Sequence, residues 1–182
     1  TTESQTHREM ASGLSMPIGF KNGTDGSFST AINAMKSASK SHHFLGVNDQ
    51  GYASIVNTTG NPDGHIVLRG GSKGVNFENQ HVKSISSQLK ESNLPHKVMI
   101  DCSHGNSNKD YRKQSDVLEN VANQIRNGEK NILGIMLESH LKEGNQKLAN
   151  RKDLEYGRSI TDACINIDTT KTLLGNLYDS IL

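Results

Sequence analysis

Two hydrophobic patterns alternate along the chain. Short apolar runs between turn residues indicate strands, whereas apolar residues at spacings of three and four indicate helices. Val82, Ile85 and Leu89, for example, share one helical face. The expected core strands are 16–20, 65–68, 98–100 and 132–137, and the expected helices are 2–13, 27–41, 77–93, 109–127 and 169–182.

Two further features add detail to this alternation. Thr2 and Gln5 have the spacing of a capping box, which predicts that the first helix begins at Thr2. Phe44–Val47 and Ala53–Asn57 flank a turn-rich link at 48–51, which predicts a β-hairpin inserted between a helix and the next strand.

Strands that alternate with helices form parallel sheets joined by right-handed crossovers. The expected strands end in Lys21, Arg69, Asp101 with His104, and Glu138. Polar groups at the carboxyl ends of successive strands are typical of the (β/α)8 or TIM barrel, which needs eight strands and roughly 250 residues. The chain has 182 residues and four expected core strands. We therefore interpret this α/β chain, residues 1–182, as the C-terminal half of a single barrel domain whose N-terminal part is absent.

Composition narrows the classes of partner. Lys and Arg number 20 against 19 Asp and Glu, so no charge excess directs the protein to nucleic acid or to an anionic membrane. No apolar run approaches the roughly 18 residues of a membrane span. Cys102 and Cys164 lie in apolar surroundings, and we interpret them as reduced thiols of a cytoplasmic protein.

His104, Glu138 and Asp162 offer one nitrogen and two oxygen donors. This set suits a divalent first-row metal ion such as Mn, Fe, Co or Zn. The three residues are far apart in sequence, so the residues alone leave an alternative open. In that alternative His104 is a hydrogen-bonded loop histidine and both carboxylates are solvated.

Lys21 and Arg69 follow two different strands and lie beside glycines. Glycine allows the backbone to approach a ligand closely, and arginine suits bidentate contact with phosphate or carboxylate. The pair is consistent with a phosphorylated anionic substrate, although strand-end ion pairs would explain it equally. Residues 22–26 are either a phosphate cradle or a plain turn before a helix, and His140 either supports the site or bonds only its own loop.

Six segments occur in an order that resembles a known family. They are TTESQTHRE, PIGFKNGTDG, HIVLRGG, MIDCSHGNSNK, ESHLKEGNQ and YGRSITDACI. They resemble the feedback-regulated, metal-dependent class of 3-deoxy-D-arabino-heptulosonate 7-phosphate (DAHP) synthases. The resemblance implies a TIM barrel that condenses phosphoenolpyruvate with erythrose 4-phosphate, a transferase reaction that begins the shikimate pathway to chorismate and the aromatic amino acids.

The resemblance also implies roles for single residues. The metal ligands of the family fall on His104, Glu138 and Asp162, and its phosphoenolpyruvate-binding residues fall on Lys21 and Arg69. A fourth ligand of the family, a cysteine, has no counterpart here, because neither cysteine of this chain matches its motif. The resemblance further implies a pocket for an aromatic amino acid inhibitor, at Met10, Leu14, Ser15, Phe44 and Gly46. In the family that this chain resembles, tyrosine-sensitive members tend to carry glycine at the position of Gly46, and phenylalanine-sensitive members tend to carry serine. The resemblance therefore favours tyrosine as the inhibitor, and the intact protein is expected to be a homo-oligomer.

Two rival hypotheses compete with this one. A sister barrel would condense phosphoenolpyruvate with a different sugar phosphate, but the hairpin and the inhibitor-pocket positions favour DAHP synthase. A truncated chain could instead be a non-catalytic binding piece. Half a barrel leaves an open sheet edge on each side, which promotes association. We therefore predict that these 182 residues alone are inactive and prone to aggregate.

Overall fold

A parallel four-stranded sheet forms the centre of the molecule. The computed structural model describes residues 2–182. The strands lie in the order β1 (Ile18–Lys21), β4 (Gly64–Leu68), β5 (Val98–Asp101) and β6 (Ile132–Met136), and all neighbours are parallel. The helices are α1 (Gln5–Ser12), α2 (Ser29–Ala38), α3 (Asn79–Glu91), α4 (Gln114–Arg126) and α5 (Ile167–Asp179).

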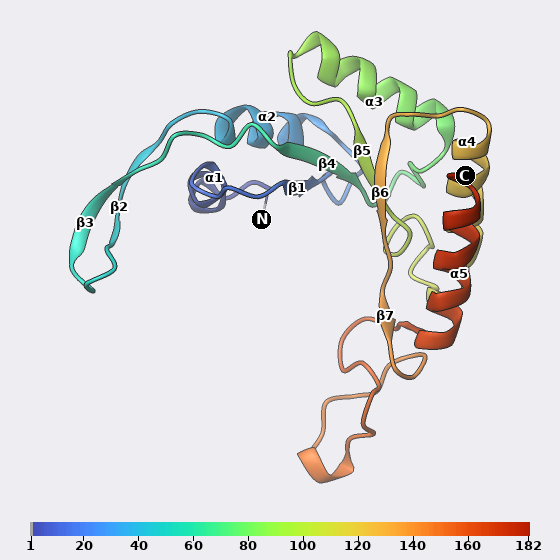
Figure 1. The fold of residues 1–182 in the computed structure, drawn as a ribbon. Helices are drawn as coiled ribbons and strands as arrows, with labels where there is room; N and C mark the ends of the chain where they lie inside the picture. Colours follow the sequence, from blue (N-terminus) through green and yellow to red (C-terminus); the bar gives the residue numbers. More distant parts are fainter. Residues whose placement is uncertain (1) are drawn as a thin grey trace.

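The two central strands are buried because helices cover them. β4 is buried at every position, and its neighbour β5 at all but one. Ile66 pairs with Val98 and Leu68 with Ile100, so aliphatic side chains continue from strand to strand. Apolar faces of α2, α3 and α4 complete one core cluster with these strands. Figure 1 shows these helices arranged along the sheet.

The expected α/β alternation with a parallel sheet is confirmed, and two predicted helix starts are wrong. The cap of α1 is Ser4, whose Oγ accepts from the His7 amide at 3.4 Å, whereas the Thr2 hydroxyl donates to the Lys21 carbonyl at 3.0 Å. The fourth helix does not begin at Lys109, which has φ +60° and so cannot continue a right-handed helix. A 3-10 turn, η1 (Tyr111–Lys113), leads into α4 instead.

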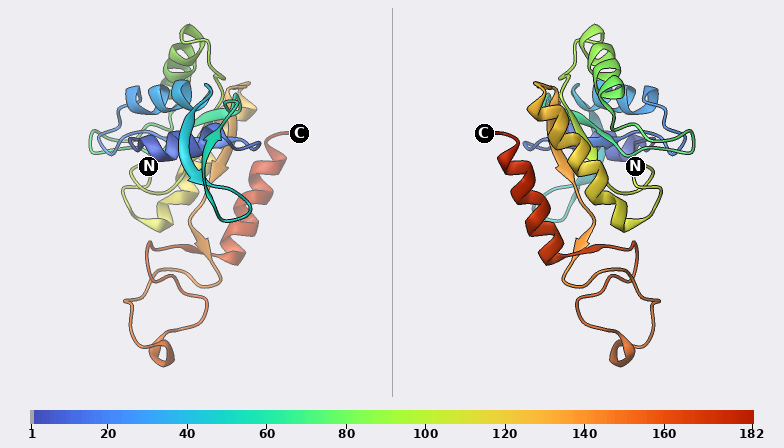
Figure 2. Two further views of the ribbon diagram at one scale, coloured as in Figure 1. Left: turned by 90° about the vertical axis from the view of Figure 1, so that its left-hand side faces the viewer. Right: turned by 90° about the vertical axis from the view of Figure 1, so that its right-hand side faces the viewer.

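Two segments extend away from the sheet (Figures 1 and 2). β2 (His43–Val47) and β3 (Ala53–Asn57) pair as an antiparallel ribbon. The stretch 141–164 contains the 3-10 turn η2 (Arg151–Asp153), and β7 (Ser139–His140) and β8 (Ile165–Asn166) pair in parallel at its base. Within residues 2–182, no helix has both the length and the apolar character needed to cross a membrane.

Candidate active site

The polar strand ends converge because the strands are parallel. Lys21 ends β1, Arg69 follows β4, Asp101 ends β5 and Glu138 follows β6. Parallel strands place their carboxyl ends on one edge of the sheet, where α/β proteins bind ligands. The local sequence therefore determines which residue stands at the end of each strand, and the common direction of the strands brings these residues together.

His104 lies in the turn after β5 and faces two carboxylates. Its Nε2 lies 4.0 Å from Glu138 Oε1 and 3.7 Å from Asp162 Oδ2. One possible ligand atom from each of the three residues lies within 4.8 Å of the others. A mixed nitrogen and oxygen donor set at this spacing fits a divalent first-row metal ion. The structure thus brings together the three residues that the sequence left far apart.

Glu138 is positioned through its backbone by a residue that the sequence analysis did not identify. Gln114, at the start of α4, has no exposed surface. Its Oε1 accepts from the Glu138 amide at 2.8 Å, and its Nε2 donates to the Glu138 carbonyl at 3.1 Å. The Glu138 side chain remains free to face His104. The signal for this contact is the burial of Gln114, and burial of a glutamine cannot be recognised from the sequence.

The site has two sides, which we call the anion side (Lys21 and Arg69) and the metal side (His104, Glu138 and Asp162). Asp101 joins them. The Lys21 ammonium donates to Asp101 Oδ2 at 2.8 Å. The same oxygen lies 2.9 Å from His104 Nδ1, although the angle is not that of an aligned hydrogen bond. The alternative of a strand-end ion pair therefore holds for Lys21. For Arg69, no carboxylate within residues 2–182 forms an ion pair with the guanidinium.

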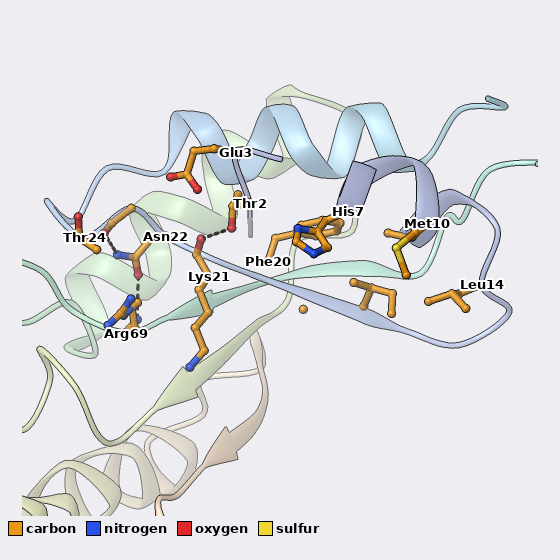
Figure 3. A pocket seen from close by; sticks show the side chains of 14 residues that line it. Thr2, Glu3, His7, Met10, Leu14, Phe20, Lys21, Asn22, Thr24 and Arg69 are labelled. Carbon is orange, nitrogen blue, oxygen red and sulfur yellow. Dashed lines mark hydrogen bonds between the residues drawn. The ribbon is translucent and has the colours of Figure 1, made fainter. Parts of the chain in front are cut away.

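Lys21 and Arg69 line one cavity of about 600 Å³ beside β1 (Figure 3). Met10 and Leu14 of the predicted inhibitor pocket line it as well. The other three residues of that predicted pocket, Ser15, Phe44 and Gly46, are not among its lining residues. Two of the five positions therefore line this cavity, and the inhibitor pocket stays a prediction.

Three buried asparagines fix the loop that carries Arg69. Asn22 Oδ1 accepts from the Arg69 amide at 2.8 Å and from Asn76 Nδ2 at 3.0 Å. Asn106 Oδ1 accepts from the Asn76 amide at 2.9 Å. Gly70 lies within this network at φ +68°, and a Cβ there would lie 2.5 Å from a carbonyl carbon of the neighbouring loop. The sequence analysis did not identify this network, since an asparagine in a loop usually faces solvent.

The structure shows the local hydrogen bonds of two segments whose roles the sequence left open. The loop 22–26 is a turn, because the amides of Gly23 and Gly26 are bonded to the carbonyls of Ser27 and Gly23. Those two N–H groups are therefore unavailable to cradle a phosphate. His140 bonds its own loop, since its Nδ1 accepts from the Leu141 amide at 2.8 Å.

The two cysteines are buried and not bonded to each other. Burial raises the pKa of the Cys102 thiol to about 12, and the neighbouring Asp101 carboxylate adds to the shift. Burial also raises the pKa of Cys164, with a further contribution from Glu138. Both thiols are therefore held in the neutral form, which is the less reactive form of cysteine.

Comparison with known proteins identifies the family. Residues 1–175 match the model of the DAHP synthetase I family. The chain belongs to this family. It is 53% identical over 182 residues to the Tyr-sensitive phospho-2-dehydro-3-deoxyheptonate aldolase of Enterobacter agglomerans, covering 100% of this chain and 85% of that protein. It is 53% identical over 181 residues to the Phe-sensitive enzyme of Escherichia coli K12, covering 100% of this chain and 51% of that protein.

A solved structure and a further sequence relative agree with this assignment to the DAHP synthetase I family. The phospho-2-dehydro-3-deoxyheptonate aldolase of Francisella tularensis SCHU S4 superposes with a TM-score of 0.94 at 48% identity, covering 100% of this chain and 52% of that one. The Tyr-sensitive enzyme of Escherichia coli K12 is 52% identical, and the chain again covers 51% of it. The chain thus spans about half the length of these two relatives.

Proposed function

We propose that the full-length protein carrying this chain condenses phosphoenolpyruvate with erythrose 4-phosphate and water, giving DAHP and inorganic phosphate. One observation carries the proposal. His104, Glu138 and Asp162 converge at the same sheet edge as Lys21 and Arg69. Membership of the DAHP synthetase I family narrows the chemistry of such a site to this condensation.

The metal side of the site would bind the aldehyde substrate. His104, Glu138 and Asp162 would hold a divalent ion, and their mixed donors are compatible with Mn, Fe, Co or Zn. When bound, such an ion supplies Lewis acidity toward the aldehyde of erythrose 4-phosphate. Asp162 is the most exposed of the three, so its side chain has the most freedom to adjust as ligands enter.

The anion side of the site would bind phosphoenolpyruvate. Lys21 and Arg69 would hold its negative charges and direct its methylene carbon at the aldehyde carbon. A carbon–carbon bond forms there, water adds at the carbon that bears the phosphate, and inorganic phosphate leaves. The two cations would offset the charge that moves on to the departing phosphate.

The four-stranded sheet would be completed to a (β/α)8 barrel by the rest of the protein. The outer strands β1 and β6 are only partly buried, unlike the central strands. This is the expected state of strands that lack a neighbour on one side. For the same reason we propose that these 182 residues alone are inactive and aggregate.

We further propose tyrosine as the feedback inhibitor. Overall similarity does not distinguish the effectors, because Tyr-sensitive and Phe-sensitive relatives are equally identical to this chain, at 53%. The proposal rests on Gly46 in the hairpin, where an added Cβ would lie 2.6 Å from Val56 Cγ2. A serine at this position would require Val56 to shift, which would reshape this part of the hairpin. Inhibition of the full-length enzyme by phenylalanine and not by tyrosine would contradict the proposal.

The central test is His104→Ala in the full-length protein. We expect metal content and the rate of phosphate release to fall by more than about 100-fold, since even residues that only support a ligand are worth 10–100-fold. His96→Ala is the matched control, because His96 precedes β5 and so lies at the opposite end of the strand. A His104→Ala variant with wild-type metal content and turnover would rule out this site.

The same preparation tests the remaining expectations. Offering a second sugar phosphate of different length distinguishes DAHP synthesis from the reaction of a sister barrel. Elemental analysis identifies the metal, and light scattering measures whether the protein is a homo-oligomer. Cell fractionation tests the expected cytoplasmic location.

A further inference from the structure

Asp101 is a fully buried carboxylate with partners on both sides. It ends β5 and has no exposed surface. Its Oδ1 accepts from the Ser103 amide at 2.9 Å, and its carbonyl oxygen accepts from Asn106 Nδ2 at 2.9 Å. Removing a carboxylate from water is costly unless it is paired. The position of this group is thus fixed from within the protein before any ligand is bound.

The second carboxylate oxygen faces two functional side chains. Oδ2 accepts from the Lys21 ammonium at 2.8 Å and lies 2.9 Å from His104 Nδ1. Lys21 comes from β1 and His104 from the turn after β5, so one oxygen links groups that are 83 residues apart in sequence, from position 21 to position 104. The anion side and the metal side of the site therefore share a single anchor.

The histidine contact is close but not aligned. His104 Nδ1 is buried and has no aligned hydrogen bond, although Oδ2 lies at hydrogen-bond distance. Hydrogen bonds at functional sites are often poorly aligned without ligand and tighten when the ligand binds. A small rotation of the imidazole would align Nδ1–H with Oδ2 and leave Nε2 directed at Glu138 and Asp162. Carboxylates commonly orient metal-binding histidines in this way.

We propose that Asp101 is a positioning residue that holds both Lys21 and His104 through one carboxylate oxygen. It sets the direction of the lysine ammonium toward the anionic substrate and the direction of Nε2 toward the metal. The inference rests on the proposed function, because it assigns Asp101 to the anion and metal sites of that reaction. Asp101 itself touches neither ligand.

The test is Asp101→Asn in the full-length protein, which preserves size and removes the charge. Two affinities are measured separately by calorimetry: Mn²⁺ alone, and phosphoenolpyruvate with metal-free protein. We expect Mn²⁺ to bind roughly 10–100-fold more weakly, the usual cost of losing a carboxylate that orients a ligand. We expect phosphoenolpyruvate to bind roughly tenfold more weakly, since Lys21 loses a charge-assisted hydrogen bond.

Asp110→Asn is the matched control. Asp110 caps η1 and pairs with Arg112 at 2.9 Å, and it forms no ion pair with Lys21 or His104. This variant is expected to keep both wild-type affinities. An Asp101→Asn protein that loses neither affinity, or only one of them, overturns the inference. Wild-type protein that binds neither ligand would overturn the proposed function as well, so the two failures are distinguishable.

A measurement on the wild-type protein covers the case in which Asp101→Asn does not fold. Cadmium is bound to full-length protein whose histidines carry an isotopic nitrogen label, and NMR couplings identify the bound ring nitrogen. We expect the metal coupling at His104 Nε2 and a proton on Nδ1. Metal coupling at Nδ1 would overturn the inference, because that nitrogen would then not face Asp101.

Discussion

The parallel sheet and the hairpin are both made of β-strands, yet they differ in strand direction and in burial. Each position of β4 is buried, whereas β2 and β3 alternate between half-buried and exposed. Two isoleucines summarise the contrast: Ile66 in β4 is 0% exposed and Ile55 in β3 is 73% exposed. The amino acid type is the same, so the difference comes from what covers each strand.

This contrast separates two kinds of functional residue. Lys21 ends β1, whereas Arg69 and His104 follow the buried central strands β4 and β5. A buried asparagine network also fixes the loop that carries Arg69. Gly46 lies on a two-stranded ribbon that Figure 1 shows extending from the body. A fixed frame suits chemistry that depends on geometry. The exposed ribbon instead leaves its apolar side chains available to other parts of the full-length protein.

The largest expected effect tests burial directly. Ile66→Ala should lower the free energy of unfolding of the full-length protein by about 2–5 kcal/mol, because it leaves a cavity in the core. Ile55→Ala should lower it by about 0.5 kcal/mol or less, as exposed positions do. Urea denaturation measures both. A large loss for Ile55→Ala would show that the hairpin is covered in the full-length protein.

A smaller effect is expected when two asparagines are compared. Asn76→Ala removes the acceptor for the Gly70 amide at 2.8 Å and leaves that buried group unpaired, which should cost about 1–3 kcal/mol of unfolding free energy. Asn48→Ala removes the acceptor for two exposed amides in the hairpin turn, and water can replace it. We expect a loss below about 1 kcal/mol there. If chemical denaturation gave equal losses of unfolding free energy for the two variants, the buried asparagine network would not stabilise the protein more than an exposed turn asparagine does.

The smallest expected effect is a pH dependence of stability at His65. Burial within β4 lowers the pKa of His65 from its ordinary value of 6.5. As the pH falls below 6.5, His65 takes up a proton more readily in the unfolded chain than in the folded protein. Stability should therefore be full above pH 6.5 and decrease as the pH falls toward the lowered pKa.

Thermal unfolding at about pH 7.5 and about pH 5.5 measures this difference within the range where histidine titrates. His65→Gln should reduce the loss of stability on acidification, and His43→Gln on the exposed hairpin is the control. A His65→Gln protein that loses as much stability as the wild type would place the pH dependence elsewhere.

The sequence identified the three candidate metal-binding residues, which the structure brings close together, but not the residues that support them. His104, Glu138 and Asp162 could be selected because their residue types bind metals and follow expected strands or loops. Gln114 and Asp101 could not be assigned roles, although Asp101 was recognised as a strand end. Their roles depend on which atoms they meet across the sheet edge, at 2.8 Å in both cases. Sequence spacing carries no information about such contacts.

The sequence by itself determined the order of strands and helices, because apolar spacing and turn residues act over short distances. It also determined that the strand ends carry the candidate chemistry. Only the tertiary structure decided the start of α4, where Lys109 has a left-handed φ, and the use of the 22–26 loop as a turn. It also decided that one oxygen of Asp101 meets both Lys21 and His104. These outcomes depend on the packing of distant segments, which no local pattern specifies.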